Sequence, residues 1–244
     1  IHMKEDNKTL QNFNISVAIT DEFMEALSKN GQYVLRQPGS LEPVGELSAS
    51  QVWSEITTGA HSTGDPGVIF IDRINSGKAN PVPNRGPIES TNPCGEQPLY
   101  PWDSCNLGSI NLANFVKDDK VDYARLSDVV KDAVHFLDNV IDMNQWPNEK
   151  IAEVSKAIRR IGLGVMGWAD MLIKLKLVYG SDESLALADS VMGFISDQAD
   201  QASQVLGMKR GAFPDIGNSI YGDGALLRNS TRTTIAPTGT ISII

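Results

Sequence analysis

The sequence predicts an α/β fold, because segments with strand-like and helix-like patterns alternate along its 244 residues. Three observations support this prediction. Phe13–Ile19 alternates in polarity and is rich in β-branched residues, Gly67–Ile74 is a compact apolar run, and Arg125–Met143 repeats apolar residues at helical spacing. The composition, 41% hydrophobic and 21% charged, is that of an ordinary globular domain.

The first third of the chain is expected to alternate strands with short helices. After the strand Phe13–Ile19, Thr20 or Asp21 can cap a helix that ends at Ser28. Residues 36–66 are rich in proline, glycine and serine. The other two elements expected there are a short helix at Ala49–Thr57, with Val52, Trp53 and Ile56 on one face, and a buried parallel strand at Gly67–Ile74.

Residues 75–103 carry many prolines and no apolar periodicity, so we expect a long irregular loop, which in a compact domain usually has a function. Regular patterns then resume. The elements expected after the loop are a strand at Leu107–Val116, helices at Arg125–Met143, Glu149–Arg160, around Val165–Leu175 and Glu183–Leu206, and a short strand at Thr233–Ala236.

The formal net charge of -9 argues against a protein that grips nucleic acid through its phosphates. The one compact basic cluster, Lys156, Arg159 and Arg160, is interpreted as a solvated helix face, with a local anion contact as the alternative. With no long apolar run, we expect a soluble cytoplasmic protein that contacts no membrane. The two cysteines and three histidines have no ligand spacing, so no metal site is predicted.

The residues that suggest chemistry lie at the end of the long loop. Asn92, Cys94 and Glu96 alternate, so an extended segment would project an amide, a thiol and a carboxylate to one side. Such a set suits a nucleophilic thiol, a redox thiol or hydrogen-atom transfer. Neither His61 nor His135 looks placed to form a thiolate, and a neighbouring carboxylate would raise the thiol pKa, which favours the neutral S–H form.

Residues 92–99 (NPCGEQPL) and 104–112 (SCNLGSINL) resemble the finger-loop motif of adenosylcobalamin-dependent, class II, ribonucleotide reductases. The eleven-residue interval from Cys94 to Cys105 matches the family spacing. Further family-like blocks run from about Asn7 to Ile244: NFNISV, DEFM, DPG, FID, RIGLGVMG and APTGTIS. The resemblance implies part of a ten-stranded α/β barrel, with a central finger loop at about residues 75–106.

The resemblance also implies roles for the motif. Cys94 would become a thiyl radical, formed with adenosylcobalamin as cofactor, and would abstract the ribose 3′ hydrogen. Glu96 would accept the 3′-hydroxyl proton, and Asn92 would hold the ribose hydroxyls. Cys105 would be one of two reducing thiols. Pro93 and Gly95 would complete this part of the substrate site.

A turn near residue 240 is the second expected substrate contact. By resemblance it holds the substrate phosphates, and a glycine flanked by hydroxyls before a helix suits that task physically. The phosphate-binding turn spans residues 236–242, and its predicted binding residues are Pro237, Thr238, Gly239, Thr240, Ile241 and Ser242.

The chain departs from the family pattern because the second reducing cysteine and a cysteine pair for re-reduction are absent. We therefore expect residues 4–244 to be a central segment of the catalytic barrel, inactive alone, with Ile1, His2 and Met3 left from an expression vector. The expected partners are a ribonucleotide, either a diphosphate or a triphosphate, the remaining segments of the parent chain, a thioredoxin-like or other dithiol reductant, and a second copy in a homodimer.

The sequence is also compatible with three other interpretations. The first is the large subunit of a class I ribonucleotide reductase. The second is an NAD-dependent dehydrogenase, because Gly162–Gly167 fits GxGxxG, although the segment before it has a helical face where that motif requires a strand. The glycines are instead expected to pack a helix or turn against the barrel. The third is a non-catalytic module, which would bind neither nucleotide nor cobalamin.

Overall fold

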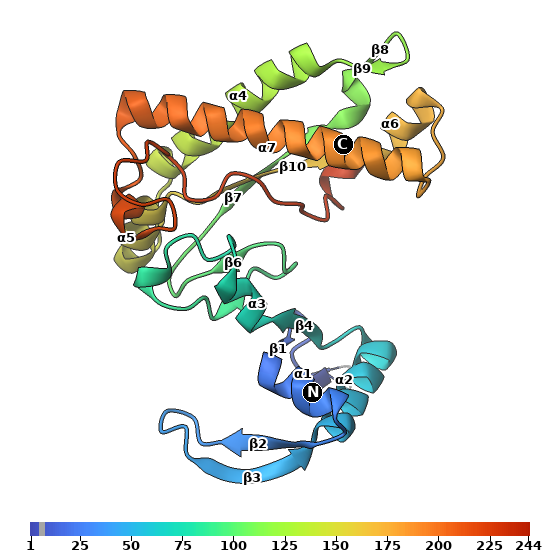
Figure 1. Cartoon of the computed structure of the whole chain (residues 1–244), viewed down its shortest axis with the longest axis vertical. Helices are drawn as coiled ribbons and strands as arrows, with labels where there is room; N and C mark the ends of the chain where they lie inside the picture. The colour runs from blue at the N-terminus through green and yellow to red at the C-terminus, as the bar shows by residue number, and fades with distance from the viewer. Residues whose placement is uncertain (5–7) are drawn as a thin grey trace. The chain divides into compact units, whose positions relative to one another are not determined.

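The computed structural model describes residues 1–4 and 8–244. They form two compact units, Ile1–Ala79 with Pro93–Gly95, and Asn80–Asn92 with Glu96–Ile244 (Figure 1). Asn7, where the family resemblance is expected to begin, lies outside the described residues. Among the described residues no helix is long and apolar enough to cross a membrane.

The first unit combines short helices with two pairs of strands. Its elements are the 3-10 helix η1 (His2–Lys4), β1 (Ser16–Ile19), α1 (Asp21–Ser28), β2 (Gln32–Arg36), β3 (Pro43–Ser48), α2 (Ala49–Thr63), β4 (Gly67–Phe70) and α3 (Ile71–Ser76). Strands β1 and β4 are parallel, as expected, and β2 and β3 form an antiparallel hairpin. The core of this unit consists of Ile19, Phe23, Ala49 and Ile56.

Helix α1 is confirmed, with the Thr20 hydroxyl accepting a hydrogen bond from Phe23 N at 3.1 Å. The sequence did not predict one feature of this unit, and one expectation was wrong. The proline- and glycine-rich stretch after residue 36 contains the loop and second strand of the β2–β3 hairpin. The run Gly67–Ile74 is a strand only to Phe70; it is largely exposed and continues as helix α3.

The second unit holds the long loop and most of the core. Its elements are η2 (Pro83–Arg85), β5 (Ser90–Thr91), β6 (Pro98–Leu99), β7 (Asn106–Asn111), η3 (Leu112–Phe115), β8 (Val116–Lys117), β9 (Lys120–Val121), α4 (Tyr123–Met143), α5 (Glu149–Ile158), β10 (Ile161–Met166), α6 (Trp168–Leu175), α7 (Asp182–Arg210), η4 (Pro214–Asn218) and η5 (Ile241–Ile243). The residues between Gly77 and Cys105 are mostly irregular, as predicted.

Two parallel strands organise this unit. β7 pairs with β10, with Asn106 opposite Ile161, and the other edge of β10 is bridged at Leu163 by Thr233. The expected strand Thr233–Ala236 is reduced to this single bridge. Helices α4 and α7 run alongside each other over the strands (Figure 1). The apolar faces of the two helices and the two strands form one continuous core.

Strand β10 corrects the interpretation of the glycine motif. The segment expected to be a helix or turn is a strand, and α6 begins only at Trp168. A Cβ atom on Gly162 or Gly164 would collide with Thr234. The glycines therefore let residues 231–235 pack directly on β10. They lie within a strand, whereas the glycines of a dinucleotide-binding motif lie in the turn that follows a strand.

Candidate active site

The NPCGE motif forms the tip of the short β5–β6 hairpin. Asn92 Oδ1 accepts a hydrogen bond from Gln97 N at 3.0 Å, and Asn92 N donates to Gln97 O at 3.0 Å. Gly95 has a φ of 86°, in the left-handed region that favours glycine. The segment is therefore a tight turn, and the expected extended conformation with alternating side chains was wrong.

The turn is shared between the two units. Asn92 and Glu96 belong to the second unit, whereas Pro93, Cys94 and Gly95 group with the first. The Cys94 side chain is exposed. The meeting of the amide, thiol and carboxylate in one small volume therefore stays a prediction.

Glu96 has a buried carboxylate oxygen with an unused capacity for hydrogen bonding. Its backbone oxygen accepts a hydrogen bond from Thr234 Oγ1 at 2.9 Å, which ties the turn to the segment packed on β10. Its Oε2 is buried and has no hydrogen-bond partner within residues 1–4 and 8–244. Because a buried unpaired oxygen is costly, this atom is suited to accept a proton or a hydrogen bond from a ligand hydroxyl.

Cys105 lies immediately before β7, and its thiol is kept protonated. Sγ donates a hydrogen bond to Asn106 O at 3.3 Å. Burial raises the thiol pKa to about 12; the Arg160 cation opposes this rise, and the carboxylates of Asp103 and Glu96 add to it. The Glu96 carboxylate is thus one of the charges that act on the Cys105 thiol, and at neutral pH the sulfur carries its hydrogen.

An ion pair beside Cys105 was not foreseen from the sequence. Arg160 Nε lies 2.9 Å from Asp103 Oδ2, and their side chains are 1% and 0% exposed. The Arg160 guanidinium also lies 5.5 Å from the ring centre of Tyr100. Asp103 and Arg160 are 57 residues apart, so no local pattern links them.

The interpretation of the basic cluster as a solvated helix face holds for Lys156, which is exposed, and is wrong for the other two residues. Arg159 and Arg160 are buried, not solvated, and both are engaged by carboxylates. Arg159 pairs with Asp138 and Asp142, each at 2.7 Å. The cause is the chain direction at the end of α5, where Arg159 adopts a left-handed conformation and the following residues enter β10.

The residues expected to hold phosphate do form a turn. Thr238 has a φ of 54°, Ser242 N donates to Thr238 O at 3.1 Å, and the 3-10 helix η5 follows. Thr238 lines a cavity of about 530 Å³ together with Gly167 and Trp168 at the start of α6. The turn is thus confirmed, and its phosphate-binding role stays a prediction.

Cys105 lines a second cavity of about 500 Å³. Its walls come from the start of β7, the end of α4, the loop to α5, α5 itself and Arg160. Three of its residues have buried polar atoms without partners among the described residues: Asn106 Oδ1, Trp146 Nε1 and Arg160 Nη2. The reducing thiol predicted from the motif is therefore next to a partly polar cavity.

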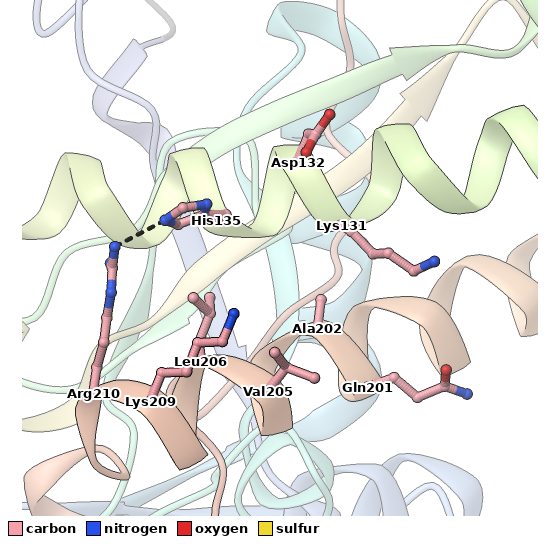
Figure 2. Close-up of a pocket in the computed structure, with 9 residues that line it drawn as sticks. All are labelled: Lys131, Asp132, His135, Gln201, Ala202, Val205, Leu206, Lys209 and Arg210. Carbon is pink, nitrogen blue, oxygen red and sulfur yellow. Dashed lines mark hydrogen bonds between the residues drawn. The ribbon is translucent and has the colours of Figure 1, made fainter.

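A third cavity, of about 330 Å³, lies between α4 and α7 and contains none of the predicted site residues (Figure 2). Arg210 Nη2 donates to His135 Nε2 at 2.8 Å, as Figure 2 shows. Arg210 also binds Asp138 and Asn139, so it is engaged in holding the two helices together.

Neither cysteine is in a disulfide, and the part of the chain that the structure describes contains no group of three histidine, cysteine or acidic side chains that could hold a metal ion.

Comparison with known proteins adds independent information. The family model described as "Ribonucleotide reductase, barrel domain" matches residues 1–227. The vitamin B12-dependent ribonucleoside-diphosphate reductase of Thermoplasma acidophilum is 52% identical over 241 residues, covering 98% of this chain and 31% of that protein. The Mycobacterium tuberculosis protein of the same name is 46% identical over 240 residues, covering 98% and 34%.

More distant matches follow. The ribonucleoside-diphosphate reductase subunit alpha of Chlamydia muridarum is 30% identical over 253 residues, covering 91% of this chain and 24% of that protein. Among solved structures, the class Id ribonucleotide reductase alpha subunit of Actinobacillus ureae superposes with a TM-score of 0.74 at 21% identity, covering 94% of this chain and 41% of that one. The chain spans about a third of the length of its more similar curated relatives.

Proposed function

Because this chain belongs to the ribonucleotide reductase family, as part of its α/β barrel domain, we propose that the whole protein reduces ribonucleotides to deoxyribonucleotides. The overall reaction takes a ribonucleotide and two thiols to a deoxyribonucleotide, a disulfide and water. The observation that supports it most is the Glu96 Oε2 atom, which is buried and has no partner among the described residues, while the charge of its carboxylate acts on the protonated Cys105 thiol. One group can accept a proton, and the other can deliver hydrogen.

The residues would share the work as follows. Cys94, as a thiyl radical, removes the ribose 3′ hydrogen, and Glu96 takes the proton of the 3′-hydroxyl. Asn92 can donate through Nδ2 to the ribose, because its Oδ1 already accepts from Gln97 N. Cys105 supplies one of the two reducing thiols. Pro93 and Gly95 shape the turn around Cys94, and residues 237–242 hold the substrate phosphates.

Adenosylcobalamin is proposed as the cofactor, because relatives at 46 to 52% identity are named vitamin B12-dependent. When bound, it would supply the organic radical that generates the thiyl group. The name of these relatives, ribonucleoside-diphosphate reductase, also favours diphosphates over triphosphates as the substrates.

The proposal includes a dithiol reductant of the thioredoxin type, a homodimeric parent and a cytoplasmic location. A reductant is needed because each turnover leaves a disulfide. Both cysteines are free, which fits a reducing compartment.

The test is an assay of the full-length parent protein with CDP or CTP, adenosylcobalamin and a dithiol, with Cys94→Ser as the paired control. Activity that requires cobalamin and disappears in the variant supports the proposal. Activity that requires an iron or manganese partner subunit would move the protein to class I. No activity under either condition would favour a non-catalytic module.

A further inference from the structure

Arg160 is a buried cation next to the reducing thiol, and the reaction outlined above assigns it no task. Its side chain is 1% exposed and pairs with Asp103 through Nε at 2.9 Å. Its guanidinium also contacts the Tyr100 ring. A buried arginine is costly to retain, so a specific contribution is to be expected where it lies beside a reactive group.

The strand register places Arg160 level with Cys105. In the parallel pairing of β7 with β10, Asn106 is opposite Ile161. Cys105 and Arg160 are the residues immediately before these two, so they lie at matching positions where the paired strands begin. Asp103 lies two residues before Cys105 and links this segment to Arg160. Its carboxylate accepts hydrogen bonds from Arg160 Nε and from Ser104 N.

Arg160 also has a donor to spare. Asp103 engages Nε, whereas the buried Nη2 has no partner among the described residues. Arg160 and Cys105 line the same cavity of about 500 Å³. Of the charges that act on the thiol, Arg160 is the one that favours its ionised form, against burial and the Asp103 and Glu96 carboxylates.

We propose that Arg160 is a positioning residue that acts through Cys105: from the matching position on the neighbouring strand, its charge stabilises the thiolate that forms when the Cys105 disulfide is reduced. In that step a thiolate of an external dithiol attacks the other sulfur of the disulfide. The S–S bond breaks, its electron pair goes to Cys105, and the resulting thiolate then takes up a proton.

The redox part of this inference rests on the proposed function, whereas the effect of Arg160 on the thiol does not. Breakage of a disulfide is faster when the leaving thiol has a lower pKa, so a cation beside Cys105 would accelerate re-reduction. A purely structural arginine would brace the loop without changing how readily Cys105 ionises. The electrostatic role therefore predicts that loss of Arg160 changes the ionisation of Cys105, whereas the structural role predicts no change.

The experiment measures the rate of Cys105 alkylation by iodoacetamide between pH 7.5 and 10 in the full-length protein under reducing conditions. Chymotrypsin cleavage after Trp102 separates Cys94 from Cys105, so mass spectrometry can follow each site. The variants are Arg160→Met, which removes the cation, Arg160→Lys, which keeps it, and Asp103→Asn, which removes the opposing carboxylate.

Arg160→Met is expected to slow Cys105 alkylation at pH 9 by roughly threefold to tenfold, because the thiolate fraction falls. Arg160→Lys should recover most of the rate, and Asp103→Asn should increase it. Loss of structure would instead expose the thiol and speed alkylation in every variant. An unchanged or faster rate in Arg160→Met, or no recovery with lysine, would overturn the proposal.

A second readout separates this inference from the proposed function. If the parent reduces nucleotides, Arg160→Met should lower the rate at which dithiothreitol reduces the oxidised enzyme, in proportion to the loss of alkylation rate. If the parent has no reductase activity, the alkylation profiles still test the effect of Arg160 on Cys105. Reductase activity with unchanged profiles would refute the role of Arg160 alone.

Discussion

Gly164 in β10 lies so close to Thr234 that a Cβ atom on the glycine would collide with the Thr234 carbonyl oxygen. Leu163 N and O hydrogen bond to the same segment, through Arg232 O at 2.8 Å and Thr234 N at 3.1 Å. Thr234 in turn binds the Glu96 backbone. Because Gly164 has no side chain, Thr234 can pack against β10, and Thr234 in turn positions Glu96, the proposed proton acceptor.

Gly164→Ala is therefore expected to destabilise the fold by about 3 kcal/mol, the upper end of the usual range for overpacking. It should also reduce activity, because displacement of Thr234 moves Glu96. Denaturant unfolding of the full-length protein measures the first effect. The matched control is Gly193→Ala in α7, where a Cβ meets nothing within 4 Å; it should be neutral or stabilising by up to about 1 kcal/mol.

Glu96→Gln should lower kcat by about 100-fold, because an amide of the same shape cannot accept the proton. The substrate KM and the free energy of unfolding should change little, since Glu96 Oε2 makes no hydrogen bond with the described residues. Steady-state kinetics on the parent protein with CDP give the answer. Glu89→Gln, an exposed change in the same loop, is the control; equal activity in both variants would remove Glu96 from the mechanism.

Asp138→Asn should cost about 3 to 5 kcal/mol of stability, because it leaves buried cations without their counter-charge. The Asp138 side chain is 0% exposed, and Arg159, Arg210 and Arg228 all bind it. Asp142→Asn is the control: Asp142 is 45% exposed, and its loss should cost about 1 kcal/mol or less. Urea unfolding compares the two, and similar losses would contradict the central role of Asp138.

Stability should fall at alkaline pH because of Cys105. Its folded pKa of about 12 exceeds the ordinary value of 9.0, so the folded state keeps a proton that the unfolded state releases. The stabilisation is complete below pH 9 and is lost as the pH rises towards 12. Unfolding measured from pH 8 to 10.5 in reductant should show a smaller decline for Cys105→Ala than for the wild type. Cys94→Ala should decline as the wild type does.

The sequence predicted elements with strong local signals. Helices α1 and α4 follow from apolar spacing and capping residues, and α7 was found although the structure extends it to Asp182 and Arg210. Strand β10 was missed because Gly162 and Gly164 remove the alternating side chains that identify a strand. The glycines serve a neighbour about seventy residues away, which no local window contains.

Some residues of the candidate site could be predicted from the sequence, and others could not. The motif and its resemblance identified Asn92, Cys94, Glu96 and Cys105. The Asp103–Arg160 pair was invisible, because a buried ion pair between distant residues leaves no periodic trace. The sequence places Arg160 on a solvated helix face. In the structure it directly precedes β10, whose first four residues are buried, and Arg160 is buried with them.

The partners of Asp138 also set an order of assembly during synthesis. Arg159 follows it by 21 residues, Arg210 by 72 and Arg228 by 90. A growing chain can thus form the first pair early, whereas the complete charge cluster must wait until α7 and the segment after it have emerged. Long-range contacts of this kind form late in folding. Until then the carboxylate has one of its three cations.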